Sequence, residues 1–175
     1  AFLILLAFII RKFTNFDAGT KAIQTLAKIV AYATLANLFF FLCEVFVAAY
    51  SQIPEHTAHL EYLFFGLHGH GALVPWMWTS IALVVAAIIL LIIPQARQNE
   101  TVLGFACVFV FIGIWIDKGL GMISGGFIPN PLHEITEYVP TVPEVLITIG
   151  VYAVGFLVLT VLYKVVTGVK EELAG

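Results

Sequence analysis

Five ionisable side chains lie within apolar stretches of this sequence, namely Glu44, His68, His70, Asp117 and Lys118. Charged and titratable groups are costly to place inside a membrane, and there they commonly mark ligand sites, ion paths or proton relays. Carboxylates and imidazoles accept and release protons, and a lysine ammonium donates hydrogen bonds. We therefore expect proton transfer or binding of a polar-headed ligand where these groups gather.

Two stretches of sequence constrain how these groups can be arranged. Asn37, Phe41 and Glu44 are three or four residues apart, so they share one face of a helix. Asp117 and Lys118 are adjacent, and their side chains would diverge by about 100° on an α-helix. We expect each of these two to pair with another helix, and Lys118 with Glu44 is one candidate ion pair. The alternative is that these polar groups only hold helices together.

The histidines of the stretch 66–71 are flanked by three glycines. His68 and His70 are two positions apart, so on a helix they would point to different sides. We expect Pro75 to kink that helix beneath them. Trp76 and Trp78 then either belong to the site or form an aromatic belt at the membrane surface.

Other residues that could do chemistry give weaker signals. His56 and His59 lie in a polar segment without the zinc-protease order of ligands, and we expect a solvated loop rather than a metal site. Cys43 and Cys107 are isolated within apolar segments and predict no disulfide or cluster site. A membrane b-type haem needs two histidines from facing helices, and only His68 and His70 approach membrane depth, on one helix. We expect no haem or iron–sulfur cluster in this chain.

The amino-acid composition of the chain indicates what kind of structural element positions these groups. Of the 175 residues, 61% are hydrophobic and 11% are charged, and the net charge is −3. Mean hydropathy is +1.03. A water-soluble domain carries roughly 25% charged residues, so this chain cannot coat a water-facing surface. These values exclude an ordinary soluble enzyme and a nucleic-acid binder, and they predict an integral membrane protein in contact with lipid.

Apolar runs long enough to cross the hydrocarbon layer need about 20 residues as helix. Four runs qualify, and we expect an all-α transmembrane helix bundle that forms a single domain over 1–175. A fifth run, 1–10, is too short to span and is expected to be the end of a helix in a longer protein. The four predicted spans are 22–50, 60–93, 101–123 and 144–167.

The distribution of basic residues predicts the topology. If 11–21 is cytoplasmic, the loop 94–100 and the tail from 165 are cytoplasmic too, and seven of the eight basic residues fall on that side. The loops 51–61 and 124–143 would lie outside and hold no basic residue. We expect a multi-pass protein of a prokaryotic cytoplasmic membrane with a cytoplasmic C-terminus. The seven residues are Arg11, Lys12, Lys21, Lys28, Arg97, Lys164 and Lys170.

Several motifs resemble a known family. The stretches 61–71, 75–78 and 113–119 are similar to the NrfD/polysulfide-reductase membrane-subunit family, closest to its ten-helix branch with HybB-like and DsrP-like subunits. The outer stretch 127–131 continues the pattern through Glu134, Glu137, Tyr138, Pro140, Pro143 and Glu144. The resemblance covers about residues 30–170. It implies two four-helix bundles with flanking helices, of which this chain would be the C-terminal half.

The resemblance also implies a function. Such subunits exchange electrons between menaquinone and an iron–sulfur, ferredoxin-like subunit on the outer face, without haem or metal of their own. Other membrane subunits accompany them, a b-type cytochrome being one candidate, as in complexes of sulfate respiration. The family's quinone pocket usually lies in the first bundle, so the polar groups here line either a quinone site or a second-bundle proton path. Those groups are Asn37, Glu44, His68, His70, Trp76, Asp117 and Lys118.

The acidic, proline-containing outer loop is the expected docking surface for the partner subunit, through His133, Glu134, Glu137 and Tyr138. Two other functions would suit the same residues. A transporter or proton channel would use buried carboxylates, although it would also need polar groups in the inner halves of the helices, which are scarce. A structural anchor would use every buried polar group to hold helices together.

Overall fold

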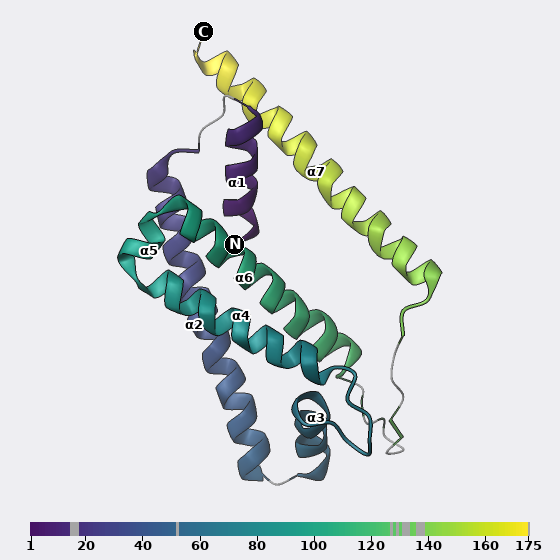
Figure 1. Cartoon of the computed structure of the whole chain (residues 1–175). Coiled ribbons are helices and arrows are strands. Elements are labelled where there is room, and N and C mark those ends of the chain that lie inside the picture. The colour runs from purple at the N-terminus through teal and green to yellow at the C-terminus, as the bar shows by residue number, and fades with distance from the viewer. Residues whose placement is uncertain are drawn as a thin grey trace. The chain divides into compact units, whose positions relative to one another are not determined.

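The computed structural model describes residues 1–14, 18–51, 53–126, 128, 130, 134–135 and 139–174, with only the backbone described at 55, 56 and 170–174. The described residues form helices joined by turns, without a strand among them (Figure 1). Four of these helices are long and apolar enough to cross a membrane. The chain is therefore an all-α, multi-pass membrane protein.

Each membrane-length helix contains a run of apolar residues, and shorter helices lie between them. The elements in chain order are α1 (Phe2–Phe13), α2 (Thr20–Ser51), α3 (Pro54–Phe64), α4 (Val74–Ile92), α5 (Pro94–Gln98), α6 (Glu100–Trp115), the π-helix η1 (Ile116–Ser124) and α7 (Val142–Ala174). The membrane-length segments are Thr20–Ser51, Val74–Ile92, Glu100–Ser124 and Val142–Val169. Three of these segments coincide to within a few residues with the predicted stretches 22–50, 101–123 and 144–167.

The prediction of one continuous span over 60–93 is wrong. Gly66, at φ +84°, follows the end of α3, and its N–H donates to the carbonyl of Glu61 at 2.8 Å. Leu67 and His70 then form two backbone hydrogen bonds of 2.9 Å around His68 and Gly69, whose φ angles are +50° and +85°. Two consecutive positive φ values are typical of a type I′ turn, which reverses the chain.

Pro75 consequently does not kink a helix. It occupies the first turn of α4, where its missing N–H leaves no hydrogen bond unmade. The three glycines that flank the histidines therefore belong to the connection between two helices, and the membrane-length part of this region is α4 alone.

Contacts divide the chain into two units, Ala1–Glu137 and Tyr138–Gly175. The second unit contains α7, whose described side chains are mostly exposed and apolar. It begins at Val142, directly after Thr141 and with Pro143 in its first turn. The carboxylate of Glu144 accepts hydrogen bonds from the backbone N–H and the hydroxyl of Thr141, at 2.7 and 2.8 Å. This pairing caps the helix N-terminus.

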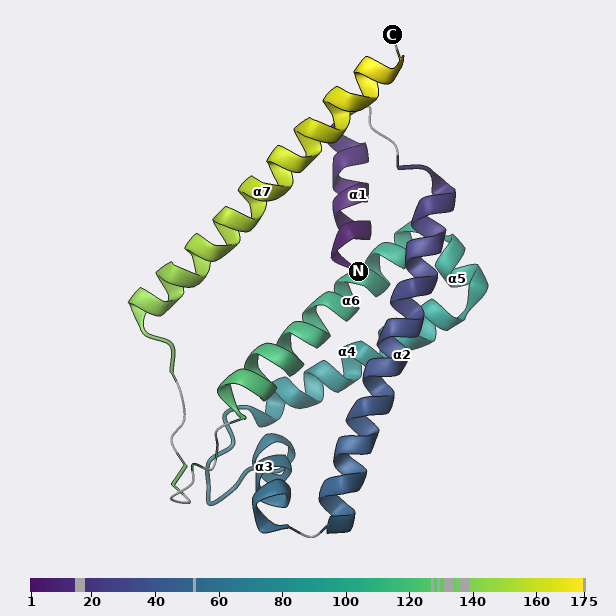
Figure 2. The same cartoon turned by 180° about the vertical axis from the view of Figure 1, so that it is seen from behind.

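In the first unit, α4 and α6 run side by side and α2 crosses them (Figure 1, Figure 2). Gly113 lets α4 and α6 approach closely, because a Cβ atom there would lie 2.8 Å from Val84 Cγ2. At the same crossing the Ser80 hydroxyl donates to the carbonyl of Gly113 at 2.8 Å. Small residues commonly permit such close contacts in membranes.

We call the buried cluster beyond this crossing the four-helix core, because it joins α1, α2, α4 and α6. All of its members are uncharged, and many are small. The core therefore forms a tightly packed apolar layer at one end of this unit. Its residues are Ile4, Ile23, Ala27, Ala31, Ala87, Leu91, Leu103, Ala106, Cys107 and Val110.

Polar contacts close the bundle at the ends of α1 and α4, which we call the basic end. Arg11 forms a bidentate ion pair with Glu100, joining α1 to the first turn of α6. Arg97 donates to the carbonyl of Leu91 at 3.2 Å, near the last turn of α4. Gln24 of α2 donates to the carbonyl of Arg97 at 3.1 Å. These contacts join α1 to α6, and they join α5 to both α4 and α2, at the same end of the bundle.

Candidate functional site

A hollow of about 450 Å³ opens between α2, α3, α4 and η1, and we call it the α3 cleft. A second hollow, of about 550 Å³, extends along α2 over Cys43 and Val47 and shares Glu44 and His59 with the first. The two hollows therefore adjoin each other. The α3 cleft is lined by Phe41, Glu44, His59, Leu60, Leu63, Phe64, Met77, Asp117, Lys118, Gly121, Met122 and Gly126.

Aromatic and sulfur-containing side chains form the apolar wall of the α3 cleft. The rings of Phe41 and Phe64 meet edge to face with their centroids 5.9 Å apart, which joins α2 to α3. Phe64 also packs against Trp78, whose indole N–H donates to the Phe64 carbonyl at 3.0 Å. Met77 is buried beside them. This wall is anchored from three helices, so it presents a fixed apolar surface to the cleft.

Asp117 and Lys118 form an ion pair with a 2.9 Å distance between Oδ2 and Nζ. The prediction that each would pair with another helix is therefore wrong, and so is the Lys118–Glu44 pair. The two residues lie in η1, where the wider turn of a π-helix reduces the angle between successive side chains. The Gly125 N–H, for example, bonds the Leu120 carbonyl five residues earlier at 2.8 Å.

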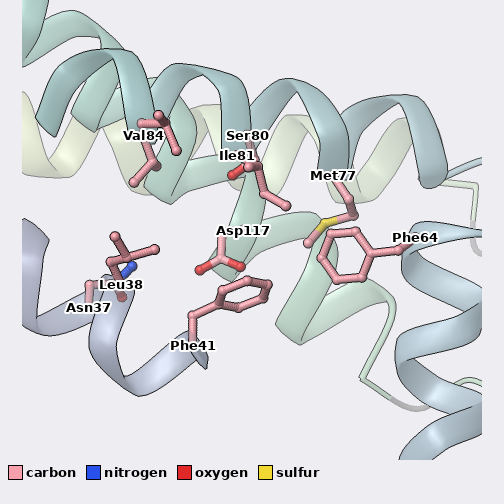
Figure 3. A pocket seen from close by; sticks show the side chains of 10 residues that line it. Asn37, Leu38, Phe41, Phe64, Met77, Ser80, Ile81, Val84 and Asp117 are labelled. Atoms are coloured by element: carbon pink, nitrogen blue, oxygen red, sulfur yellow. The ribbon is translucent and has the colours of Figure 1, made fainter. Parts of the chain in front are cut away.

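The Asp117 carboxylate also faces a smaller cavity of about 40 Å³ between α2, α4 and η1 (Figure 3). Asn37 lines it from α2 and Ser80 from α4. The hydroxyl of Ser80 already donates to Gly113, so its oxygen can still accept a hydrogen bond. This space is large enough to hold water, and it has polar groups on three sides. Asp117 lines both this cavity and the α3 cleft.

Glu44 and His59 face the α3 cleft from opposite helices. Glu44 is exposed on α2, and the described residues give it no ion pair. His59 is partly buried on α3, and its Nδ1 lies 3.3 Å from the carbonyl oxygen of Ile128. The prediction of a solvated loop around His59 is wrong, because Pro54–Phe64 is a helix. The spacing of His59, Tyr62 and Leu63 at i, i+3 and i+4 was the available signal for a buried face.

The structure brings some predicted residues together and separates others. Glu44, Asp117 and Lys118 line the α3 cleft, and Asn37 lines the small cavity that Asp117 shares. His68 and His70 are instead exposed in the turn before α4, and Trp76 is 50% exposed on α4. None of these last three lines the hollows described above. The reason is the type I′ turn, which removes the two histidines from any membrane helix.

The predicted docking residues fall mostly outside the described part of the chain. His133, Glu137 and Tyr138 are not described. Glu134 is exposed, and its N–H donates to the Asn130 side-chain oxygen at 2.9 Å while its carbonyl accepts from the Asn130 N–H at 3.1 Å. These two hydrogen bonds hold Asn130 and Glu134 together, and the acidic side chain of Glu134 lies at the surface.

No three His, Cys, Asp or Glu side chains of the described residues are gathered as they would be around a metal ion. The arrangement in the α3 cleft instead offers proton acceptors and a hydrogen-bond donor beside an apolar wall. Such a combination suits a flat, largely apolar ligand with polar edges.

Comparison with known proteins gives no match to a protein-family model, to a curated protein or to a solved structure. The resemblance to the NrfD family therefore rests on the sequence motifs alone.

Proposed function

We propose that this chain is a quinone-interacting membrane subunit of a multi-subunit respiratory oxidoreductase. In this proposal it exchanges electrons between menaquinol or menaquinone and an iron–sulfur subunit on its outer face, and it takes up or releases protons. The observation that carries the proposal is the α3 cleft, where an aromatic wall faces two carboxylates, an imidazole and an ammonium group.

The size and chemistry of the α3 cleft support a quinone as the ligand. Its volume of about 450 Å³ lies within the range of roughly 300–1,000 Å³ found for small-molecule sites. Phe41 and Phe64 offer ring surfaces for a flat headgroup. The Lys118 ammonium can donate a hydrogen bond to a carbonyl oxygen, and the Glu44 carboxylate can accept one from a hydroxyl. These residues can therefore orient the polar edges of such a ligand.

Proton transfer by side chains of this cleft completes the proposal. When bound, a quinol supplies two electrons and two protons. Glu44 and Asp117 are carboxylates within the same hollow, so either can receive a proton there. Protonation of Asp117 would remove the negative partner of Lys118, which leaves the ammonium free to bind elsewhere in the cleft.

The four-helix core favours this function over transport through the bundle. Its described members are apolar and uncharged, and Ala27, Leu91 and Leu103 are fully buried. A path for ions would need polar groups through that layer. Quinol oxidation confined to one end of the unit, with electrons passed to a partner, needs no polar groups in that layer.

Protection of Cys43 tests this proposal. Cys43 lines the hollow that adjoins the α3 cleft, whereas Cys107 is fully buried in the four-helix core. In the whole protein within its membrane complex, N-ethylmaleimide should alkylate Cys43 and spare Cys107. A hydroxyquinoline N-oxide, which is a non-electrophilic quinol analogue, should slow alkylation of Cys43 at least tenfold and inhibit quinol oxidation.

Mass spectrometry of the alkylated peptides gives both rates in one sample, with Cys107 as the internal control. If saturating analogue leaves the alkylation of Cys43 and the turnover unchanged, the α3 cleft is not a quinone site and the proposal fails.

A further inference from the structure

The position of His59 would allow its side chain to do chemistry as well as to pack against its neighbours. It lies on α3, and it lines both hollows that meet at Glu44. Its side chain is partly buried, so one part of the ring faces the protein and another remains reachable from the cleft or the solvent.

A hydrogen bond fixes the role of one ring nitrogen. His59 Nδ1 lies 3.3 Å from the carbonyl oxygen of Ile128, which is itself buried in the cluster around Tyr62 and Met77. A carbonyl oxygen only accepts, so Nδ1 must carry the hydrogen in the neutral ring. Nε2 is then the basic nitrogen, and the described residues give it no hydrogen-bond partner. The imidazole is therefore held with its proton-accepting atom available.

The charged groups around His59 come from two neighbouring elements. Glu44 faces the shared hollow from α2, and the Asp117–Lys118 ion pair faces it from η1. α4, which also packs on α3, contributes the uncharged Met77. On α3 itself, Glu61 is exposed. Protonation of His59 would thus place a positive charge in a space that already holds two carboxylates and one ammonium group.

We propose that His59 is a proton-carrying residue of the α3 cleft, a role that rests on the proposed function. Nε2 accepts one of the two protons of the quinol, forming an N–H bond as an O–H bond of the quinol breaks. Glu44 accepts the other proton, and the two electrons leave to the iron–sulfur partner. The imidazolium and the protonated Glu44 then each return a proton to water, which restores the carboxylate and the neutral ring with its hydrogen on Nδ1.

The substitution His59→Asn tests this role in the whole membrane complex reconstituted into vesicles. The asparagine amide can still donate to the Ile128 carbonyl, but it cannot carry a proton. We expect quinol oxidation to fall about 10²-fold, the typical contribution of one acid–base group. The dependence of the rate on pH should also change, because a group that accepts a proton during turnover has been removed. Protection of Cys43 by the hydroxyquinoline N-oxide should persist, because binding does not need the proton.

Thr57→Val is the matched control, since Thr57 lies on α3 and bonds only backbone carbonyls of the preceding turn. It should keep both the rate and the pH profile. If the wild-type complex neither binds the analogue nor oxidises quinol, the proposed function itself fails. If the wild-type complex does both and His59→Asn keeps the rate and profile, only the role of His59 is overturned. Loss of Cys43 protection in His59→Asn would also overturn it, because His59 would then hold the ligand.

A measurement on the unaltered protein covers the case in which His59→Asn does not fold. Diethyl pyrocarbonate modifies the free nitrogen of neutral imidazoles, and peptide mass spectrometry reports each histidine separately. His59 should be modified, and the analogue should protect it while it leaves the exposed His68 reactive. Failure of the reagent to reach His59, or equal modification with and without analogue, would contradict the proposal.

Discussion

The four-helix core and the α3 cleft belong to the same unit, yet they differ in the size and charge of their side chains. Core positions such as Ala27, Ala87 and Ala106 are small and almost fully buried. The cleft is bounded by large rings and by ionisable groups, and it leaves open space. Small residues let helices approach until little space remains, whereas large and charged residues hold helices apart. Packing and site chemistry are thus separated along the bundle.

Experiments can test whether packing and site chemistry are separated in this way. Substitutions in the core or at the basic end should change stability with little effect on turnover per folded molecule. Substitutions of charged groups in the α3 cleft should change turnover even where stability is restored.

The largest effect is expected at Asp117. Asp117→Asn keeps the shape of the side chain but removes the charge that pairs with Lys118 and the carboxylate that both cavities share. Quinol oxidation should fall about 10²-fold, as for loss of a proton acceptor. Steady-state turnover of the purified complex measures this effect, and circular dichroism reports whether the helices remain.

The double variant Asp117→Asn with Lys118→Met separates chemistry from structure. It removes both charges, so no lone ammonium is left in the helix and thermal stability should return toward that of the wild type. Turnover should stay low. Recovery of both stability and turnover in the double variant would mean that the ion pair only holds η1 in place.

A smaller effect is expected at the α4–α6 crossing. In Gly113→Ala the new Cβ would lie 2.8 Å from Val84 Cγ2 and 3.3 Å from the Ser80 carbonyl oxygen, so the helices must move apart. We expect a loss of about 1–3 kcal/mol in unfolding free energy. Thermal unfolding in detergent, followed by circular dichroism, measures the shift in Tm.

Gly104→Ala is the matched control on the same helix, because its nearest contact would be the Phe8 ring at 3.9 Å. It should cost nothing measurable. Equal destabilisation by both substitutions would show that close packing at Gly113 is not the cause. A fall in turnover per folded molecule for Gly113→Ala would show that core and cleft are coupled.

The smallest effect is expected at the basic end. Arg11 and Glu100 have side chains that are 34% and 38% exposed, so solvent screens their attraction. A double-mutant cycle with Arg11→Met and Glu100→Gln should give a coupling of about 0.2–1 kcal/mol, as for other exposed pairs. The coupling should decrease as salt is raised. A turnover change comparable with that of Asp117→Asn would contradict the separation of the two regions.

Much of the fold could be predicted from sequence because apolar length is a local property. Spans near 22–50, 101–123 and 144–167 correspond to helices, and the Thr141–Glu144 start of α7 follows from capping chemistry. The prediction of one continuous span over 60–93 was wrong for a reason that is also local. Its average hydropathy exceeded that of a soluble segment, but Gly66 and Gly69 take positive φ values that a continuous helix cannot contain.

The candidate site was harder to predict, because its members come from separate elements. Glu44 and Asp117 could be singled out one at a time, since any carboxylate in an apolar helix is conspicuous. His59 was harder to recognise, because a histidine in a short polar segment does not stand out from its neighbours. Only its spacing with Tyr62 and Leu63 indicated a buried helix face. Its place in the cleft depends on how α3 folds back against α2, and on the distant Ile128 carbonyl.

The sequence alone determined that this chain spans a membrane with several helices, and it singled out Glu44, Asp117 and Lys118 as ionisable groups within them. These properties follow from the cost of exposing polar groups to lipid, which depends on composition over about 20 residues. Only the tertiary structure decided that Asp117 pairs with Lys118, that His68 and His70 lie in a turn, and that His59 joins Glu44 at one cleft. Those outcomes depend on contacts between residues far apart in the chain. They also depend on a π-helix, in which successive side chains diverge by a smaller angle than in an α-helix.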